Sequence, residues 1–438
     1  MTGTTMNGDL RRSDKARKPG GALRVFASRA TALTLLVACV AAPEQRASSS
    51  PSPTAQVPAP SATTASSSPT SPPPSPSPTF SPSPTPVDPL KAMTLEERVA
   101  QLFMVGTGVD HPDPLTLRAV ADYHVGGIFL RGRSRAGVQE TATLVARFTA
   151  HVPRSGPALW VAVDQEGGNV QSLSGPGFDV IPSALEQSRR GCRKLIDATR
   201  TWGRQLAAAG VTTDLAPVVD IVAGPDLAEK NPPIGKLDRE YGYDEATVVH
   251  CAGAVATGLR AAGILPTFKH FPGLGRVTAN TDFEPHVVDT QVGQNSPDVD
   301  TYRELLARGT RIVMVSTAVY RRIDPSAPAA FSATVVTDLL RRALHFHGVV
   351  MTDDLSATAQ VADWSLGARA ILSIRAGVDL LLVSADAEAF PPMYRAVLRA
   401  AREDPALAAK VDLAARRVIT AKEEFPGPLD GDVQAERW

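Results

Sequence analysis

The sequence predicts an α/β protein: a single (β/α)8 TIM-like barrel preceded by a disordered N-terminal signal and linker. Short apolar runs alternate with helix-length segments to the end of the chain. The runs are nearly continuous rather than alternating, as is typical of parallel strands buried on both faces. No glycine fingerprint follows the first run, which argues against an open dinucleotide-binding sheet. Eight such runs favour a closed barrel.

Residues 1–39 have the pattern of an export signal. A basic region between Arg11 and Arg29 precedes an apolar run, 30–38, which is too short to span a bilayer permanently. Leu36–Cys39 resembles the lipobox of bacterial lipoproteins, which implies lipidation of Cys39; an ordinary signal peptide with an incidental cysteine is the alternative. We therefore expect export and a membrane lipoprotein on the extracellular face, held by its lipid anchor only.

The rest of the chain divides into three parts by composition. Residues 40–87 are dominated by Ser, Pro, Thr and Ala, which cannot bury enough apolar surface to fold and predict a disordered linker. The barrel is expected over residues 88–425, with a tail at 426–438. Basic and acidic residues number 45 each, so electrostatics give no reason to expect a nucleic-acid partner.

Within the barrel segment, Thr94 and Glu97 have the spacing of a capping box that opens a first helix. Helix-length segments include Arg193–Ala209, Glu245–Ala262 and Val335–Leu344. The predicted strands are Leu102–Val105, Gly127–Leu130, Leu159–Val163, Thr212–Ala216, Leu265–Phe268, Ile312–Val315, Val349–Thr352 and Leu380–Val383. Cys192 and Cys251 lie in helix-like segments, and the sequence does not decide whether they pair.

Polar side chains follow the predicted strands where barrels place their active sites. They are Asp164, Glu166, Asp220, Arg239, Lys269, His270, Ser316, Thr317, Asp353 and Asp354. A mouth of this kind suits a neutral polyhydroxylated ligand bound by charge-assisted hydrogen bonds. No residue pattern resembles a zinc or calcium ligand set, and no cofactor is expected.

Three motifs resemble the bacterial β-N-acetylhexosaminidases of glycoside hydrolase family 3. They are Val163–Gly168 (Val-Asp-Gln-Glu-Gly-Gly), Lys269–Gly273 (Lys-His-Phe-Pro-Gly) and Thr352–Ser356 (Thr-Asp-Asp-Leu-Ser). The resemblance covers roughly residues 88–424. It implies a barrel that removes terminal N-acetylglucosamine with retention, through a covalent glycosyl-aspartate. Amino-sugar glycosides, including cell-wall fragments, are then the expected substrates.

The resemblance also implies roles for single residues. The family's nucleophile falls on Asp353, and its ligands for substrate hydroxyl groups fall on Asp164, Arg239, Lys269 and His270. From the residues themselves, Glu166 and Asp220 are interpreted as structural hydrogen-bond acceptors at strand ends. Asp354 is interpreted as a carboxylate that supports the site or lies at a helix N-terminus. Gly167 and Gly168 are interpreted as permitting a tight turn.

The sequence departs from the family pattern at three places. Asn280-Thr281-Asp282 replaces the Asp-x-His dyad, in which the family's histidine acts as acid/base. Leu274 replaces the motif's second histidine, and Asn169 replaces an arginine after the glycine pair.

The missing histidine leaves several hypotheses open. Asp282 can take the acid/base role if Asp353 nearby raises its pKa, since like charges disfavour joint ionisation. Glu284 and His286 are other candidates for that role. Alternatively, the domain is a sugar-binding lipoprotein without turnover, or a β-glucosidase. An aldolase with Lys269 as Schiff-base nucleophile is disfavoured by the neighbouring carboxylates, which would hold its pKa up.

Overall fold

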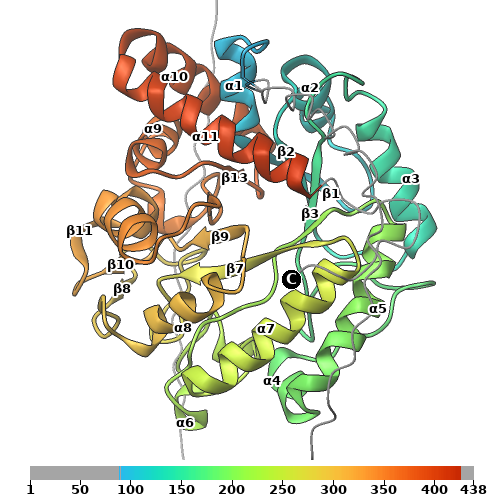
Figure 1. Cartoon of the computed structure of the whole chain (residues 1–438), viewed down its shortest axis with the longest axis vertical. Coiled ribbons are helices and arrows are strands. Elements are labelled where there is room, and N and C mark those ends of the chain that lie inside the picture. The colour runs from blue at the N-terminus through green and yellow to red at the C-terminus, as the bar shows by residue number, and fades with distance from the viewer. Residues whose placement is uncertain (1–87, 89, 426–438) are drawn as a thin grey trace, which may run out of the picture. The chain divides into compact units, whose positions relative to one another are not determined.

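The computed structural model of the chain describes residue 88 and residues 90–425 (Figure 1). The predicted signal peptide with Cys39, the predicted linker up to residue 87 and the predicted tail 426–438 lie outside the described residues. Eight parallel strands form one sheet in the order β12-β9-β7-β6-β3-β2-β1-β13. A parallel bridge between Met351 and Leu380 joins the two edges and closes the barrel. The predicted (β/α)8 fold is confirmed.

Each of the eight predicted apolar runs forms a barrel strand. The strands are β1 (Phe103–Gly108), β2 (Gly127–Arg131), β3 (Trp160–Val163), β6 (Thr213–Asp214), β7 (Leu265–Phe271), β9 (Ile312–Val315), β12 (Val349–Thr352) and β13 (Leu381–Val383). Short strands outside the barrel are β4 (Gln165–Gly167), β5 (Val170–Gln171), β8 (Val288–Asp289), β10 (Val319–Tyr320) and β11 (Asp324–Pro328).

Helices follow most of the strands. They are α1 (Leu95–Gln101), α2 (Pro114–Tyr123), α3 (Val138–Thr149), α4 (Ala184–Arg189), α5 (Leu195–Ala208), α6 (Pro225–Ala228), α7 (Glu245–Ala261), α8 (Pro297–Leu306), the π-helical η4 (Thr334–Ala343), α9 (Leu366–Ala376), α10 (Phe390–Glu403) and α11 (Pro405–Glu424). Short 3₁₀ turns are η1 (Cys192–Lys194), η2 (Gly235–Leu237), η3 (Ala329–Phe331), η5 (Ala359–Val361) and η6 (Ala387–Ala389). The predicted capping box is confirmed, because the Thr94 hydroxyl accepts from the amide of Glu97 while the Glu97 carboxylate accepts from the amide of Thr94.

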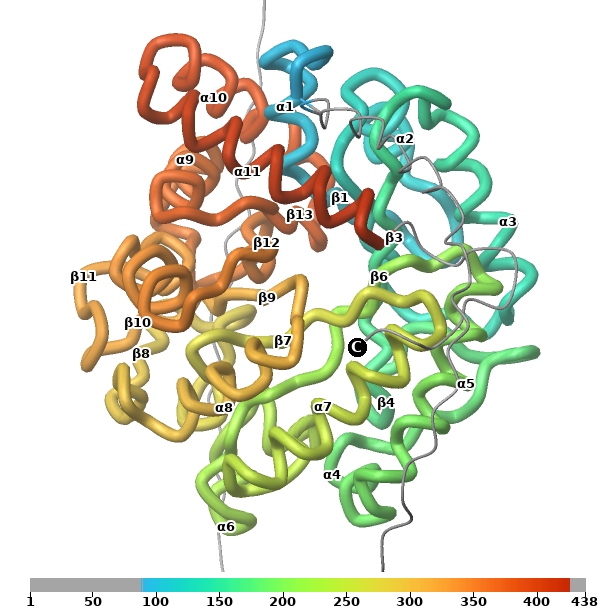
Figure 2. Tube along the Cα trace, viewed as in Figure 1, coloured from blue at the N-terminus to red at the C-terminus, as the bar shows by residue number. Residues whose placement is uncertain are grey.

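Two apolar layers hold the barrel together. One fills its interior with residues such as Met104, Trp160 and Met351, and the other packs the helices against the outer face of the strands. Val418 and Ala421 of α11 belong to the interior layer. In Figure 2, α11 lies over one side of the ring of strands, near β13 and β1. Helix α11 therefore covers part of one end of the barrel, and the opposite end, with the carboxyl ends of the strands, forms the mouth.

A disulfide joins Cys192 of η1 to Cys251 of α7, with Cα atoms 4.6 Å apart. The sequence had left this pairing open. Cys251 is fully buried, and the bridge links two segments that are 59 residues apart in the chain.

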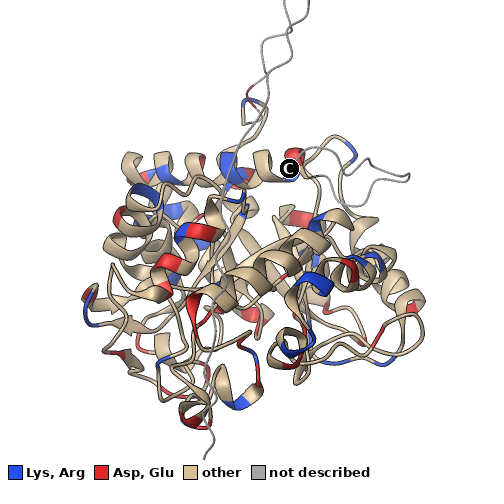
Figure 3. Ribbon diagram, turned by 60° about the horizontal axis from the view of Figure 1, so that its bottom comes forward, with Lys and Arg blue, Asp and Glu red and all other residues tan. Residues whose placement is uncertain are grey.

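Positive and negative side chains are interspersed over the helices rather than gathered by sign (Figure 3). This distribution agrees with the equal totals of basic and acidic residues. Among residues 88 and 90–425, every helix is too short or too polar to cross a membrane.

Candidate active site

The mouth of the barrel contains a largely buried group of two cations and two carboxylates. The Lys269 ammonium lies 2.7 Å from Asp164 Oδ1 and 2.5 Å from Glu166 Oε1. Arg239 binds Glu166 through two parallel hydrogen bonds, from Nε at 2.8 Å and from Nη2 at 2.7 Å. Glu166 therefore holds both cations at once, as a structural acceptor, which supports its predicted role.

Mutual pairing sets the charges in this group. Burial alone would raise the pKa of Glu166, but Arg239 and Lys269 lower that pKa to about 2. Burial would lower the pKa of Lys269, but Asp164 and Glu166 raise it above its usual value. The lysine is therefore a permanent ammonium, which argues against Schiff-base chemistry because that chemistry needs a neutral amine.

Among residues 88 and 90–425, both cations keep N–H donors that no hydrogen bond within the protein uses. The ammonium of Lys269 has three N–H groups and a guanidinium has five. Lys269 spends two of them on Asp164 and Glu166, and Arg239 spends three on Glu166 and the Pro233 carbonyl. Asp164 has a side chain that is 30% exposed, against 3% for Lys269. Asp164 is thus the part of the group most accessible to a ligand.

Asp214 lies beside this group and was not singled out from the sequence. It ends the short strand β6, and its Oδ1 accepts from the amide of Gln165 at 3.1 Å. Burial raises its pKa to about 8, against the opposing effects of the Gln165 amide and Lys269. Burial therefore favours the protonated form of Asp214. A carboxyl group within the predicted strand Thr212–Ala216 was the signal that could have found it.

His270 follows Lys269 in β7, and the carboxylate of Asp220 holds it in place. The pairing of β7 with β9 shifts register between Phe268 and Phe271, so the regular alternation of side chains is interrupted here. Nδ1 of His270 lies 2.7 Å from Asp220 Oδ2, and Asp220 also accepts from the amides of His270 and Leu274. Asp220 is fully buried and acts as a structural acceptor. It leaves Nε2 of His270 as the nitrogen available to a ligand.

Two adjacent carboxylates after β12 occupy different environments. Asp354 is buried and accepts from the hydroxyls of Ser356 and Ser384 and from the amides of Ser384 and Ala357. Asp353 is half-buried, and its Oδ1 accepts only from the amide of Asp354 at 2.8 Å among the hydrogen bonds of the described residues. Asp354 therefore has its acceptor oxygens engaged within the protein, in agreement with a supporting role. Asp353 keeps acceptor capacity for a ligand.

Asp282 lies on the loop after β7, which is fixed to the segment after β12. The amide of Ala359 donates to the Asp282 carbonyl at 3.2 Å, and that of Gln360 donates to the Thr281 carbonyl at 3.0 Å. The Thr358 hydroxyl lies 3.4 Å from both Asp282 Oδ1 and Asp354 Oδ2. These contacts, which the sequence did not predict, bring Asp282 to the two carboxylates after β12.

The environment of Asp282 changes its acidity. The residue reaches solvent, but the surrounding protein removes enough hydration from its carboxyl group to raise the pKa. The charges of Asp353 and Asp354 raise it further, to about 6, against the opposing effects of His270 and Arg239. Asp282 is thus a weak acid at the rim of the mouth, close enough to Asp353 for their charges to interact.

The other positions that depart from the family pattern are also placed by the structure. Asn280 accepts from the amide of Asp282 at 2.9 Å and so shapes the loop. Leu274 is buried and Asn169 is exposed. Glu284 and His286 are both exposed on the same loop as Asp282. Within the described residues, no group of three or more His, Cys, Asp or Glu side chains has a geometry that could hold a metal ion.

Comparison with known proteins agrees with this geometry. The family model described as "Glycosyl hydrolase family 3 N terminal domain" matches residues 94–421. The chain is 35% identical over 343 residues to the β-hexosaminidase LpqI of Mycobacterium tuberculosis, covering 76% of this chain and 83% of that protein. It is 33% identical over 267 residues to a β-hexosaminidase of Aromatoleum aromaticum, covering 59% of this chain and 72% of that protein.

Solved structures give the same result. The crystal structure of a β-N-acetylhexosaminidase from Beutenbergia cavernae superposes with a TM-score of 0.75 at 51% identity, covering 76% of this chain and 99% of that one. The structure of M. tuberculosis LpqI superposes with a TM-score of 0.65 at 32% identity, covering 77% and 95%. With the barrel, its three motifs and the family match in agreement, the chain belongs to glycoside hydrolase family 3.

Proposed function

We propose that this protein is a retaining β-N-acetylhexosaminidase that removes terminal N-acetylglucosamine through a covalent intermediate on Asp353. The observation that carries the proposal is the pair formed by Asp353 and Asp282. Asp353 has free acceptor capacity, and Asp282 has its pKa raised to about 6 by partial loss of hydration and by the charges of Asp353 and Asp354. Retaining glycosidases commonly divide nucleophile and acid/base between two such groups.

In the first step the Asp353 carboxylate attacks the anomeric carbon, and the bond from that carbon to the leaving-group oxygen breaks. Asp282 donates its proton to that oxygen, so the leaving group departs as a neutral alcohol. The raised pKa of Asp282 keeps a useful fraction protonated near neutral pH.

In the second step Asp282 accepts a proton from water, the resulting hydroxide attacks the anomeric carbon, and the bond to Asp353 breaks. The covalent bond has removed the charge of Asp353, which raised the pKa of Asp282 in the free enzyme. The acidity of Asp282 therefore increases when it has to act as a base. This change is how one carboxyl group serves both steps.

The buried cluster suits recognition of the sugar. Asp164 can accept from a hydroxyl group, and the unused donors of Lys269 and Arg239 and the Nε2 of His270 can complete a ring of hydrogen bonds. Charge-assisted bonds of this kind are about twice as strong as neutral ones. Glu166 and Asp220 keep these groups in place.

We also propose the finer placement of the protein. The basic and apolar pattern that ends at Cys39 supports export and attachment through a lipid on Cys39. Residues 40–87 would then form a tether between this anchor and a domain spanning residues 88–425, and residues 426–438 would form a C-terminal tail. A relative from Arthroderma benhamiae, 33% identical over 242 residues, is described as a secreted glycosyl hydrolase. Cell-wall fragments are then accessible substrates.

A panel of nitrophenyl glycosides tests the activity. Wild type should hydrolyse the N-acetylglucosaminide in preference to the glucoside, and proton NMR should first detect the β-anomer of the product. Preference for the glucoside would indicate a β-glucosidase. If wild type and Asp353→Ala both fail to hydrolyse any glycoside while N-acetylglucosamine still binds, the domain is a sugar-binding protein and the proposal is wrong.

A further inference from the structure

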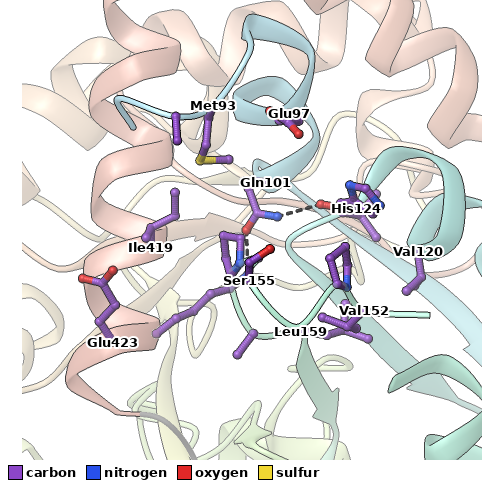
Figure 4. Close-up of a pocket in the computed structure, with 17 residues that line it drawn as sticks. Met93, Glu97, Gln101, Val120, His124, Val152, Ser155, Leu159, Ile419 and Glu423 are labelled. Atoms are coloured by element: carbon purple, nitrogen blue, oxygen red, sulfur yellow. Dashed lines mark hydrogen bonds between the residues drawn. The ribbon is translucent and has the colours of Figure 1, made fainter. Parts of the chain in front are cut away.

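A cavity of about 720 Å³ lies at the end of the barrel opposite the mouth. Its lining comes from the segments that precede β1, β2 and β3 and from the last turns of α11 (Figure 4). Aliphatic and proline side chains make up much of this lining, including Met93, Val120, Val152, Leu159 and Ile419. The volume is within the range of small-molecule sites.

One buried ammonium group belongs to this cavity. Lys422 is 3% exposed, and its Nζ donates to Gln101 Oε1 at 2.7 Å. Gln101 is itself held by a bond from its Nε2 to the His124 carbonyl at 2.6 Å. Nζ also lies 5.5 Å from the centre of the Trp160 ring, within the range of a cation–π contact. The protein therefore fixes the position of this cation.

No anion of the described chain balances the charge of Lys422. Its partners, an amide oxygen and an aromatic ring, are neutral, and within residues 88 and 90–425 it forms no ion pair. The titratable groups that line the cavity with it are Glu97, His124 and Glu423. Glu97 is engaged in the capping box of α1. Burial alone, with no compensating carboxylate, lowers the pKa of Lys422 to about 7.

We infer that this cavity is a binding site for a small amphiphilic monocarboxylate. The carboxylate would pair with the Lys422 ammonium, and an apolar chain would occupy the aliphatic part of the lining. A buried cation without a counter-ion is unfavourable, so a monoanion would supply the missing charge. The unused N–H groups of the ammonium provide the donors. The site is separate from the mouth, and the inference does not depend on the proposed hydrolase activity.

Proton linkage gives this site a distinctive signature. Because a carboxylate favours the ammonium form, ligand binding raises the pKa of Lys422, and the complex takes up a proton where the free group is neutral. With a free pKa of about 7, uptake should rise from about 0.1 proton at pH 6 to about 0.9 at pH 8. The dissociation constant should increase roughly 30-fold between pH 6 and pH 8.5.

Isothermal titration calorimetry of the full chain with sodium octanoate tests the inference. Titrations in buffers of different ionisation enthalpy measure proton uptake, and octanamide serves as the neutral comparison ligand. Lys422→Met removes the ammonium and keeps an apolar chain, whereas Ser155→Trp, on an exposed lining residue, obstructs the cavity and keeps the ammonium. Lys410→Met, on the same helix and outside the lining, is the matched control.

Saturable octanoate binding with this proton uptake, lost in Lys422→Met and in Ser155→Trp and retained in Lys410→Met, supports the site. Octanamide binding as tight as octanoate, or octanoate affinity unchanged by Lys422→Met, overturns it. If Lys422→Met does not fold, Ser155→Trp decides, because octanoate binding that this variant leaves intact is not in the cavity. Absence of saturable octanoate binding to wild type also overturns the inference.

Discussion

Replacing Asp282 by asparagine tests the assignment of the acid/base, and the structure sets the size of the effect. The pKa of Asp282 rises from its ordinary 3.8 to about 6. At pH 7 this shift increases the protonated fraction of the carboxyl group from about 0.06% to about 9%, roughly 150-fold. The environment at the mouth therefore makes a carboxyl group usable as an acid at neutral pH.

The pH dependence of wild type follows from the same value. Asp282 must be protonated in the free enzyme to assist departure of the leaving group. For a methyl glycoside, whose leaving group needs that proton, kcat/KM should fall about tenfold per pH unit above about pH 6. In Asp282→Asn this limb should disappear, and kcat/KM at pH 6 should be about 10²–10⁴-fold lower.

The choice of leaving group and a control variant separate acid catalysis from damage to the loop. A 2,4-dinitrophenyl glycoside needs little protonation, so Asp282→Asn should form the covalent intermediate from it readily, and azide should accelerate breakdown of that intermediate. Glu284→Gln makes the same change of charge on the same loop and should resemble wild type. An alkaline limb near pH 6 that persists in Asp282→Asn, or equal losses on both substrates, would refute the assignment.

Two further predictions concern stability. Arg239 and Lys269 lower the pKa of Glu166 from 4.5 to about 2, although burial opposes them. The contribution of the ionised Glu166 to the free energy of unfolding is therefore fully present above pH 4.5 and is lost as the pH falls toward 2. Glu166→Gln should lower the free energy of unfolding by about 3 kcal/mol at pH 7, and in urea unfolding the variant should lose less stability than wild type as the pH is lowered. An equal loss of stability at low pH in both proteins would contradict the pairing. The Cys192–Cys251 bridge spans 59 residues, and its reduction should lower the free energy of unfolding by about 4 kcal/mol in the chain-entropy model. A urea midpoint unaffected by reductant would contradict that stabilisation.

The sequence predicted the barrel because its strands are short apolar runs buried on both faces. Val349–Thr352 and Ile312–Val315 were predicted with the bounds that the structure shows. The parallel barrel then explains why polar residues after separate strands, such as Asp164, Lys269 and Asp353, come together at one mouth. A strand that is buried on both faces needs apolar residues at nearly every position, and this pattern lies within one short stretch of sequence.

What could not be predicted depends on contacts between distant segments. The bidentate bond of Glu166 to Arg239 joins residues 73 positions apart. The docking of the Asp282 loop uses backbone groups of Ala359 and Gln360, which leave no sequence pattern. Lys422 lies in α11 and was not singled out from the sequence, because its burial arises only when α11 packs against the end of the barrel.

The covalent intermediate is the centre of the proposed mechanism, and trapping it is the most direct measurement. Wild type would be incubated with a 5-fluoro-N-acetylglucosaminyl fluoride, which forms the intermediate faster than it breaks down, and digested for peptide mass spectrometry. We predict one sugar per chain, attached to the side chain of Asp353, and no adduct in Asp353→Asn. A sugar on any other residue, or turnover by Asp353→Asn comparable to that of wild type, would contradict the mechanism.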